Sequence, residues 1–505
     1  MNMLLLVGSI FAFSQPYSGE KLSRGLIGIP AEDGMYLSWH MTLEDAAGLQ
    51  FDLYRSSGGG AEVKLNKEPI DRTSDFLDRT VDYTVDNRWT LKATTGEVAI
   101  WTRLKGEERN PYLSVPVCKP EDGEIAGESF TYTANDCSVG DLDGDGEYEI
   151  ILKWFPSNSK RPPQRGFTGN TYLDAYKMDG TRLWRIDLGP NVRSGAATTN
   201  FLVFDFDGDG CAEICCKTGD GTVDGLGHRI GDAQADWRTW DKKSPTYGKI
   251  VNGSEYLTVF EGRTGKELDS KEYIPTRYPL DGWGGVGGNC GNDNTGGRSD
   301  RFTAGVAFLD GKTPSPVMVR GWYGRTVVAA WTFTNGALKH TWTFDSAAPG
   351  WEAYSGMGNH SVTVADFDGD GCDEICVGAM TVDHDGKGLF TTGLRHGDAL
   401  HAGRFIPSRQ GMQVFGVHEN EGDNEIVKRT PAVAMFDGAT GEIIWQDGLG
   451  QDAGRGVAAD IDPRYDGAEC WCNIGGLRRG DTGEIISNRT VSYTHLRAHE
   501  TTLHL

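Results

Sequence analysis

A short acidic string that recurs along the chain constrains its fold more than any other feature. The strings DLDGDGEYEI, DFDGDGCAEI and DFDGDGCDEI begin at Asp141, Asp205 and Asp366. Weaker versions occur around Asp310 and Asp460, so that successive starts lie 64, 105, 56 and 94 residues apart. Apolar runs flank each copy, which is typical of a strand, a tight turn and a second strand. The repeat predicts a structural unit of about 50 residues with large insertions.

A second kind of hairpin lies between the acidic strings. Alternating runs around a Gly-containing turn begin at Tyr172, Tyr256 and Val433. Two hairpins per repeat give four strands per repeat, and tandem four-stranded units favour the blades of a β-propeller. The sequence predicts five such blades within residues 126–490, and a solenoid of stacked hairpins stays open as the alternative.

The chain before the first repeat has shorter alternating runs, among them MYLSWH, LQFDLYRSS and SDFLD. This spacing predicts a fibronectin-type β-sandwich over residues 15–125. The predicted fold class is therefore all-β, with a sandwich followed by a propeller.

The first residues contain an apolar run, from 4 to 13, that resembles the core of a signal peptide spanning residues 1–14. The usual positive segment before it is missing, so the run is either a partial signal or the front of a first strand. No later stretch reaches the 18 or so apolar residues of a transmembrane helix. We expect a secreted or periplasmic protein.

The charge of the chain limits its partners. The sequence has 72 Asp and Glu against 49 Lys and Arg, a net charge of −23. This charge repels nucleic acid and anionic membranes, so neither is expected as a partner. It would also repel a polyuronate, unless bound divalent cations offset the carboxylates.

The acidic strings have the ligand spacing of calcium loops. Asp at positions 1, 3 and 5 with Gly at 6 matches the opening of an EF-hand loop, although the closing Glu stands at position 9 and begins a strand. Asp-Gly pairs also form plain turns, but a turn does not require four converging carboxylates. The predicted calcium ligands are Asp141, Asp143, Asp145 and Glu149; Asp205, Asp207, Asp209 and Glu213; and Asp366, Asp368, Asp370 and Glu374.

A second group of candidate ligands combines imidazoles with carboxylates. Five of the eleven His lie within 59 residues, and the candidate group takes four of them together with nearby acidic residues. A mixed shell of this kind suits a transition metal, so zinc is the first expectation from the residue types alone. The group consists of His360, His396, Asp398, His401, His418 and Glu419.

Several motifs in order are similar to one enzyme family. LSWH, FDLYR, DLDGDGEYEIILKW, NCGNDNTGGRSDRF, GNHSVTVADFDGDG, GLRHGDALH and DAGRGVAADIDPRYDGAE resemble the rhamnogalacturonan lyases of polysaccharide lyase family 11. The resemblance implies a sandwich before an eight-bladed propeller, several calcium ions, and β-elimination between rhamnose and galacturonate in pectic rhamnogalacturonan I. It also implies that His360, His396, Asp398 and Glu419 hold calcium and that Arg455 contacts the uronate.

The implied chemistry leaves the catalytic base open. Elimination removes the C5 proton of a uronate, and positive charge from calcium or Arg455 would stabilise the carbanion. His360 is a candidate base only if it is not a metal ligand. Endo or exo action also stays open.

The alternative function is a calcium-binding, integrin-like propeller that adheres to a partner or binds carbohydrate without catalysis. Such a module needs the acidic loops but no convergence of the His and carboxylate group. A monomer is expected in either case.

The last stretch, VSYTHLRAHETTLHL, departs from the repeat pattern and resembles a translated sequencing adapter. Residues 491–505 are therefore predicted to be a non-native tail, and the propeller is predicted to lack its C-terminal blades.

Overall fold

The structure is a computed structural model that describes residues 24–41, 45–46, 48–107, 112–284, 291–420, 425–462 and 464–488. Within these ranges the only α-helix is the five-residue α1 (Glu425–Arg429), so the fold is all-β, as predicted. No helix of the described chain has the length and hydropathy needed to cross a membrane. The predicted signal peptide and the predicted non-native tail lie outside the described residues.

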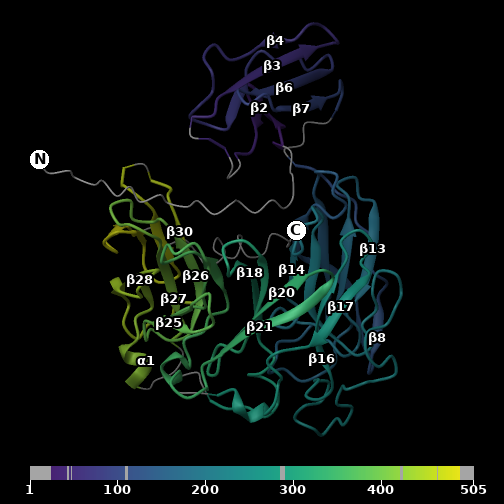
Figure 1. Cartoon of the computed structure of the whole chain (residues 1–505), viewed down its shortest axis with the longest axis vertical. Coiled ribbons are helices and arrows are strands. Elements are labelled where there is room, and N and C mark those ends of the chain that lie inside the picture. The colour runs from purple at the N-terminus through teal and green to yellow at the C-terminus, as the bar shows by residue number, and fades with distance from the viewer. Residues whose placement is uncertain are drawn as a thin grey trace, which may run out of the picture.

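The N-terminal part is a β-sandwich, as predicted, and Figure 1 shows it set apart above the remaining sheets. Alternate residues of its strands point inward, so that Phe51 and Leu53 are buried beside Trp39 and Trp89 in one core. One sheet has the order β1-β2-β5 and the other β4-β3-β6-β7. The strands are β1 (Ile27–Ala31), β2 (Gly34–Ser38), β3 (Phe51–Ser57), β4 (Val63–Lys64), β5 (Asp75–Asp78), β6 (Asn87–Ala93) and β7 (Val98–Arg103).

A short hairpin, β8 (Gly123–Ile125) with β9 (Glu128–Phe130), precedes six four-stranded sheets in the described chain. In each sheet the strands pair antiparallel in chain order, which confirms the hairpins predicted from Tyr172, Tyr256 and Val433. The first three sheets are β10 (Tyr132–Gly140), β11 (Glu149–Pro156), β12 (Tyr172–Tyr176), β13 (Arg182–Asp187); β14 (Phe201–Phe204), β15 (Glu213–Gly219), β16 (Glu255–Phe260), β17 (Glu267–Glu272); and β18 (Phe302–Phe308), β19 (Pro314–Arg320), β20 (Val327–Thr334), β21 (Ala337–Asp345). The others are β22 (Thr363–Ala365), β23 (Glu374–Cys376), β24 (Met380–Val382), β25 (Gly388–Thr391); β26 (Gly397–Gly403), β27 (Gln413–His418), β28 (Val433–Asp437), β29 (Ile443–Asp447); and β30 (Gly456–Ala459), β31 (Glu469–Cys472), β32 (Leu477–Arg479), β33 (Ile485–Ser487).

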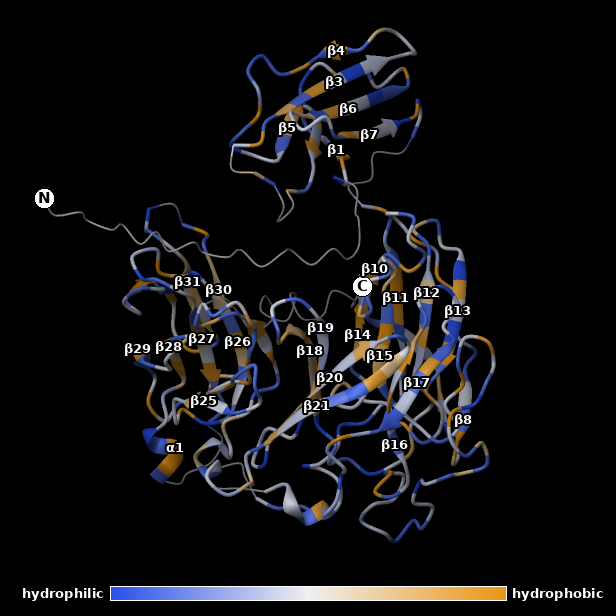
Figure 2. Cartoon of the chain, viewed as in Figure 1, coloured by the Kyte–Doolittle hydropathy of each residue, from blue (hydrophilic) through white to orange (hydrophobic). Residues whose placement is uncertain are grey.

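Consecutive sheets pack face to face, and the first strand of each sheet lies beside the first strand of the next. One apolar cluster fills each interface between neighbouring sheets. Figure 2 shows the apolar residues concentrated along these strands. At three interfaces a Trp of the fourth strand donates its indole N–H to a turn of the next sheet, as Trp184 does to Gly262.

Six sheets are one more than the five units that the acidic strings predict. The sheet β26–β29 has no acidic turn: Gln413 Oε1 accepts the N–H of Ile406, where Glu213 Oε2 accepts the N–H of Phe206 in the second sheet. An amide replaces the closing carboxylate and keeps its backbone hydrogen bond, so the acidic pattern misses this unit. The eight blades of the resemblance stay a prediction.

The topology separates two sets of loops. The acidic loops join the first and second strands of a sheet, whereas other segments lead into the first strands at the opposite end. Asn359, four residues before β22, pairs in parallel with Gly397, the first residue of β26, so the chain enters these two strands in the same direction. Residues directly before successive first strands therefore gather at one end of the sheets.

Candidate metal centre

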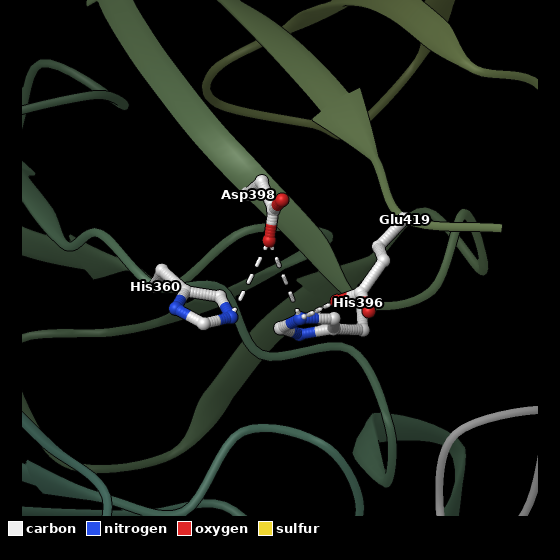
Figure 3. A group of neighbouring side chains, drawn as sticks. All are labelled: His360, His396, Asp398 and Glu419. Atoms are coloured by element: carbon white, nitrogen blue, oxygen red, sulfur yellow. Dashed lines mark ion pairs between the residues drawn. The ribbon is translucent and has the colours of Figure 1, made fainter. Parts of the chain in front are cut away.

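Four side chains converge at the end of the sheets where the first strands begin. His360 lies before β22, His396 and Asp398 lie at the start of β26, and Glu419 directly follows β27. One nitrogen or oxygen from each lies within 4.8 Å of the others. Figure 3 shows the two imidazoles and two carboxylates pointing toward a common centre. The structure thus brings together all four residues that the resemblance implies.

The protonation of His396 prepares it to bind a cation. Its Nδ1 donates to the carbonyl of Gly358 at 2.7 Å, which leaves the lone pair on Nε2. Burial lowers the pKa of His396 to about 3, so the ring is neutral at pH 7. Nε2 is buried without a hydrogen bond and lies 2.9 Å from Glu419 Oε2. Two electron-rich atoms at this distance fit a bound cation between them.

His360 completes the other side of the cluster. Its Nε2 lies 3.3 Å from Asp398 Oδ1 and 3.3 Å from the hydroxyl of Tyr323. Although 35% of its side chain is exposed, loss of water around the ring, and then His396 and two arginines, lower the pKa of His360 well below 6.5. The ring of His360 is therefore also neutral at pH 7.

Arg455 stands beside this cluster, directly before β30. Its Nη1 lies 3.4 Å from Asp398 Oδ2. The backbone N–H groups of Gly454 and Arg455 both donate to Asn473 Oδ1, at 2.9 and 3.2 Å. With 28% of its side chain exposed, the guanidinium can reach a ligand in solvent while Asn473 fixes its backbone.

The two remaining imidazoles of the predicted group lie elsewhere. His401 Nε2 contacts the carbonyl of Gly456 at 2.9 Å, and buried His418 contacts the carbonyl of Arg395 through Nδ1 at 3.3 Å. Neither belongs to the set of converging atoms. Each of them instead contacts a carbonyl group of a neighbouring backbone segment.

The acidic loops lie at the other end of the sheets, and the second is the most complete. Asp205, Asp207, Asp209 and Glu213 each place one oxygen within 4.8 Å of the others. Burial and the three Asp carboxylates raise the pKa of Glu213 to about 9. A cation would neutralise this crowded negative charge, which fits the predicted calcium loop.

The first acidic loop already contains a positive charge. Asp141, Asp143 and Glu149 converge, while Asp145 is not part of that set. The ammonium of Lys177 lies 2.7 Å from Asp143, 3.4 Å from Asp145 and 3.6 Å from Glu149. Directly after the third strand, where the first sheet has Lys177, the second has Glu261.

In the third loop, a different set of side chains converges. Glu374 converges with Asp383 and His384, and Asp370 with Cys372 and His384. Asp366 accepts the N–H groups of Gly369 and Gly371, as Asp205 accepts those of Gly208 and Gly210 in the second loop. Burial and nearby Asp368 raise the pKa of Glu374 to about 8.

Sequence reasoning missed three residues next to the His and carboxylate cluster. Tyr323 lies against His396 with ring centroids 4.3 Å apart. The guanidinium carbons of Arg298 and Arg301 lie 4.4 and 4.7 Å from the Tyr323 ring centroid. Both arginines belong to the motif NCGNDNTGGRSDRF, and Arg301 stands directly before β18, as Arg455 stands before β30.

Two family models match the chain. The model described as "Rhamnogalacturonan lyase family 11, C-terminal domain" matches residues 112–500, and "Rhamnogalacturonan I lyases beta-sheet domain" matches residues 17–102. Among curated proteins, the rhamnogalacturonan exolyase YesX of Bacillus subtilis (strain 168) is 49% identical over 455 residues, which are 90% of this chain and 70% of YesX. The rhamnogalacturonan endolyase YesW of the same organism is 46% identical over 463 residues, 90% of this chain and 69% of YesW.

Solved structures show the same similarity. The Bacillus licheniformis rhamnogalacturonan lyase PL11 superposes with a TM-score of 0.84 at 48% identity, over 95% of this chain and 77% of that one. The exotype lyase YesX superposes with a TM-score of 0.83 at 47% identity, over 94% of this chain and 75% of that one.

Proposed function

The chain belongs to rhamnogalacturonan lyase family 11, and on this basis we propose that it cleaves the rhamnose–galacturonate backbone of rhamnogalacturonan I by β-elimination. The chain is an enzyme, a polysaccharide lyase whose substrate is a pectic polysaccharide. The convergence of His360, His396, Asp398 and Glu419 supports the proposal that the reaction takes place at this end of the sheets. A non-catalytic adhesion module is not favoured, because the characterised relatives are lyases.

We propose that these four residues hold a calcium ion. Support comes from the buried Nε2 of His396, which has no hydrogen bond and faces Glu419. The two carboxylates supply the hard oxygen ligands that calcium prefers. The two imidazoles also suit zinc, so zinc is tested as an alternative to calcium. An ion held there would supply positive charge opposite the carboxylate of a bound uronate. Calcium is also proposed for the second and third acidic loops, where its role would be structural.

Arg455 is the proposed catalytic residue at this centre. β-Elimination transfers the C5 proton of the galacturonate to a base, and the electron pair expels the oxygen at C4. Negative charge then spreads onto the uronate carboxylate, and a guanidinium aimed there stabilises the transition state. His360 Nε2 points into the cluster, so we assign His360 to the ion and not to proton abstraction.

Product analysis tests this function. The purified chain is incubated with rhamnogalacturonan I, and both ultraviolet absorbance and new reducing ends are followed. Elimination produces an unsaturated uronate that absorbs, whereas hydrolysis produces reducing ends without that absorbance. Reducing ends alone would contradict the elimination, and binding of the polymer without any product would restore the adhesion alternative. Unbranched polygalacturonan serves as the control and is expected to stay intact.

We also propose that the enzyme acts outside the cytoplasm, in the medium or the periplasm, since a polymeric substrate does not cross a membrane. Fractionation of the producing cells tests this location. The expected monomer is tested by light scattering.

A further inference from the structure

Two arginines beside the candidate metal centre pair with no carboxylate of the described chain. Within that part of the chain, Arg298 and Arg301 form no ion pair, and their only hydrogen bonds run from Nε to the carbonyls of Gly291 and Gly297. Elsewhere in the molecule, buried Arg277 and Arg320 both pair with Glu255. Burial lowers the pKa of Arg301, as expected for a guanidinium without a close counter-ion.

The surroundings hold both guanidiniums in place. Each stacks on Tyr323, and Arg301 also lies 5.7 Å from the ring centroid of Trp322. Tyr323 in turn contacts His360 and His396, so the same ring touches both the two arginines and the two imidazoles of the cluster. Stacking leaves the edge of a guanidinium, with its Nη groups, available to a ligand.

The local charge also favours an anion. Arg298, Arg301 and Arg455 supply three positive charges against the two carboxylates of Asp398 and Glu419, and a divalent ion would add two more. The whole chain carries −23. The immediate surroundings of the cluster are therefore positive on an acidic protein, and they would attract an anionic polymer.

We propose that Arg298 and Arg301 form a carboxylate-binding subsite that takes a galacturonate unit of the substrate, with Tyr323 as the residue that positions both guanidiniums. The inference rests on the proposed function and adds to it two substrate-binding residues. Arginine suits this role because its planar fork matches a carboxylate through paired N–H···O bonds. The site selects the acidic sugar of the backbone, since the neutral rhamnose offers no charge.

Steady-state kinetics on rhamnogalacturonan I test the subsite with Arg298→Gln, Arg301→Gln and the double variant. We expect KM to rise about tenfold for each single variant, because a charge-assisted hydrogen bond to the substrate is lost, with a smaller change in kcat. KM of the wild type should rise with salt, and that of the double variant should respond less. Arg409→Gln, at an exposed arginine, is the matched control.

Arg301→Lys provides a second test if Arg301→Gln fails to fold, since lysine keeps the positive charge but lacks the planar guanidinium. We expect its KM to lie between those of the wild type and Arg301→Gln. If Arg301→Gln does not fold, the KM of Arg301→Lys should still be higher than that of the wild type. Unchanged KM and unchanged salt dependence in folded variants would overturn the subsite. Failure of the wild type to release unsaturated uronate would instead overturn the proposed function, so the two failures are distinguishable.

Discussion

At the scale of single residues, geometry selects among imidazoles that the sequence could not rank. His360, His396, His401 and His418 lie in one stretch of chain, and the residue types alone favour none of them. The lead-in segments before β22 and β26 place two of them in the cluster, while His401, four residues into β26, contacts the carbonyl of Gly456. Only the resemblance to a family named the pair that converges with the carboxylates, because convergence depends on strand packing and not on spacing.

Arg455 is the residue whose loss should affect catalysis most and stability least. In Arg455→Ala we expect kcat to fall about 10²- to 10³-fold, as when a group that stabilises transition-state charge is removed. The melting temperature should barely change, because the side chain is 28% exposed and lies 3.4 Å from Asp398. Arg455→Lys should recover part of the rate. A large loss of stability with normal turnover would make Arg455 a structural residue.

At the scale of elements, buried charges tie the second and third sheets together. Glu255 begins β16 and pairs with Arg277 and Arg320 at 2.8 Å each, while Lys217 of β15 lies at 3.4 Å. These positive charges hold the pKa of Glu255 well below its usual range, against the opposing effect of burial. The network contrasts with Arg298 and Arg301, which form no ion pair with any described carboxylate.

Glu255→Gln should therefore destabilise the protein by about 3–5 kcal/mol at pH 7, because it removes the carboxylate that Arg277 and Arg320 share and leaves Arg320 only Asp300 at 3.4 Å. The contribution of the carboxylate is fully present above the unfolded pKa near 4.3 and is lost as pH falls below it. Urea midpoints of wild type and variant should thus approach each other between about pH 5 and 3. Exposed Glu272→Gln is the control, and an equal effect of both substitutions would contradict the network.

The acidic loops share one sequence pattern but differ in the charges that surround it. All three share the same first turn, yet Lys177 lies among the carboxylates of the first loop. The repeat was visible in the sequence because its Asp and Gly positions coincide. The contact of the lysine with the loop was not, because Lys177 follows another strand, β12, and meets the loop only through β11–β12 pairing.

We expect Lys177 to act as an internal cation that weakens calcium binding at the first loop. Elemental analysis after dialysis against dilute calcium should find one ion more per chain in Lys177→Met and one fewer in Glu213→Gln. Lys339→Met, at an exposed lysine on strand β21 and outside the loops, should match the wild type. Equal calcium in Lys177→Met and wild type would show that Lys177 does not compete with the ion.

At the scale of the whole molecule, the sequence predicts much of the architecture and less of the site. Alternating runs locate the sandwich strands, such as β2, β3 and β5, and the hairpins of three sheets. The acidic pattern does not predict the sheet β26–β29, because Gln413 stands in place of the closing Glu. The sequence does not predict the roles of Arg298, Arg301 and Tyr323. Their only shared feature is a position at one end of the sheets, and this position can be seen only in the packed structure.

The central claim is that the cluster of His360, His396, Asp398 and Glu419 binds the ion on which elimination depends. It is tested most directly by the initial rate of unsaturated-uronate release from metal-depleted protein, titrated with calcium or with zinc, for wild type and His396→Ala. We expect the wild-type rate to return in a saturable way with calcium and the variant rate to stay low at the same concentrations, although both melt cooperatively. Full wild-type activity after depletion, or the same calcium response in both proteins, would contradict the claim.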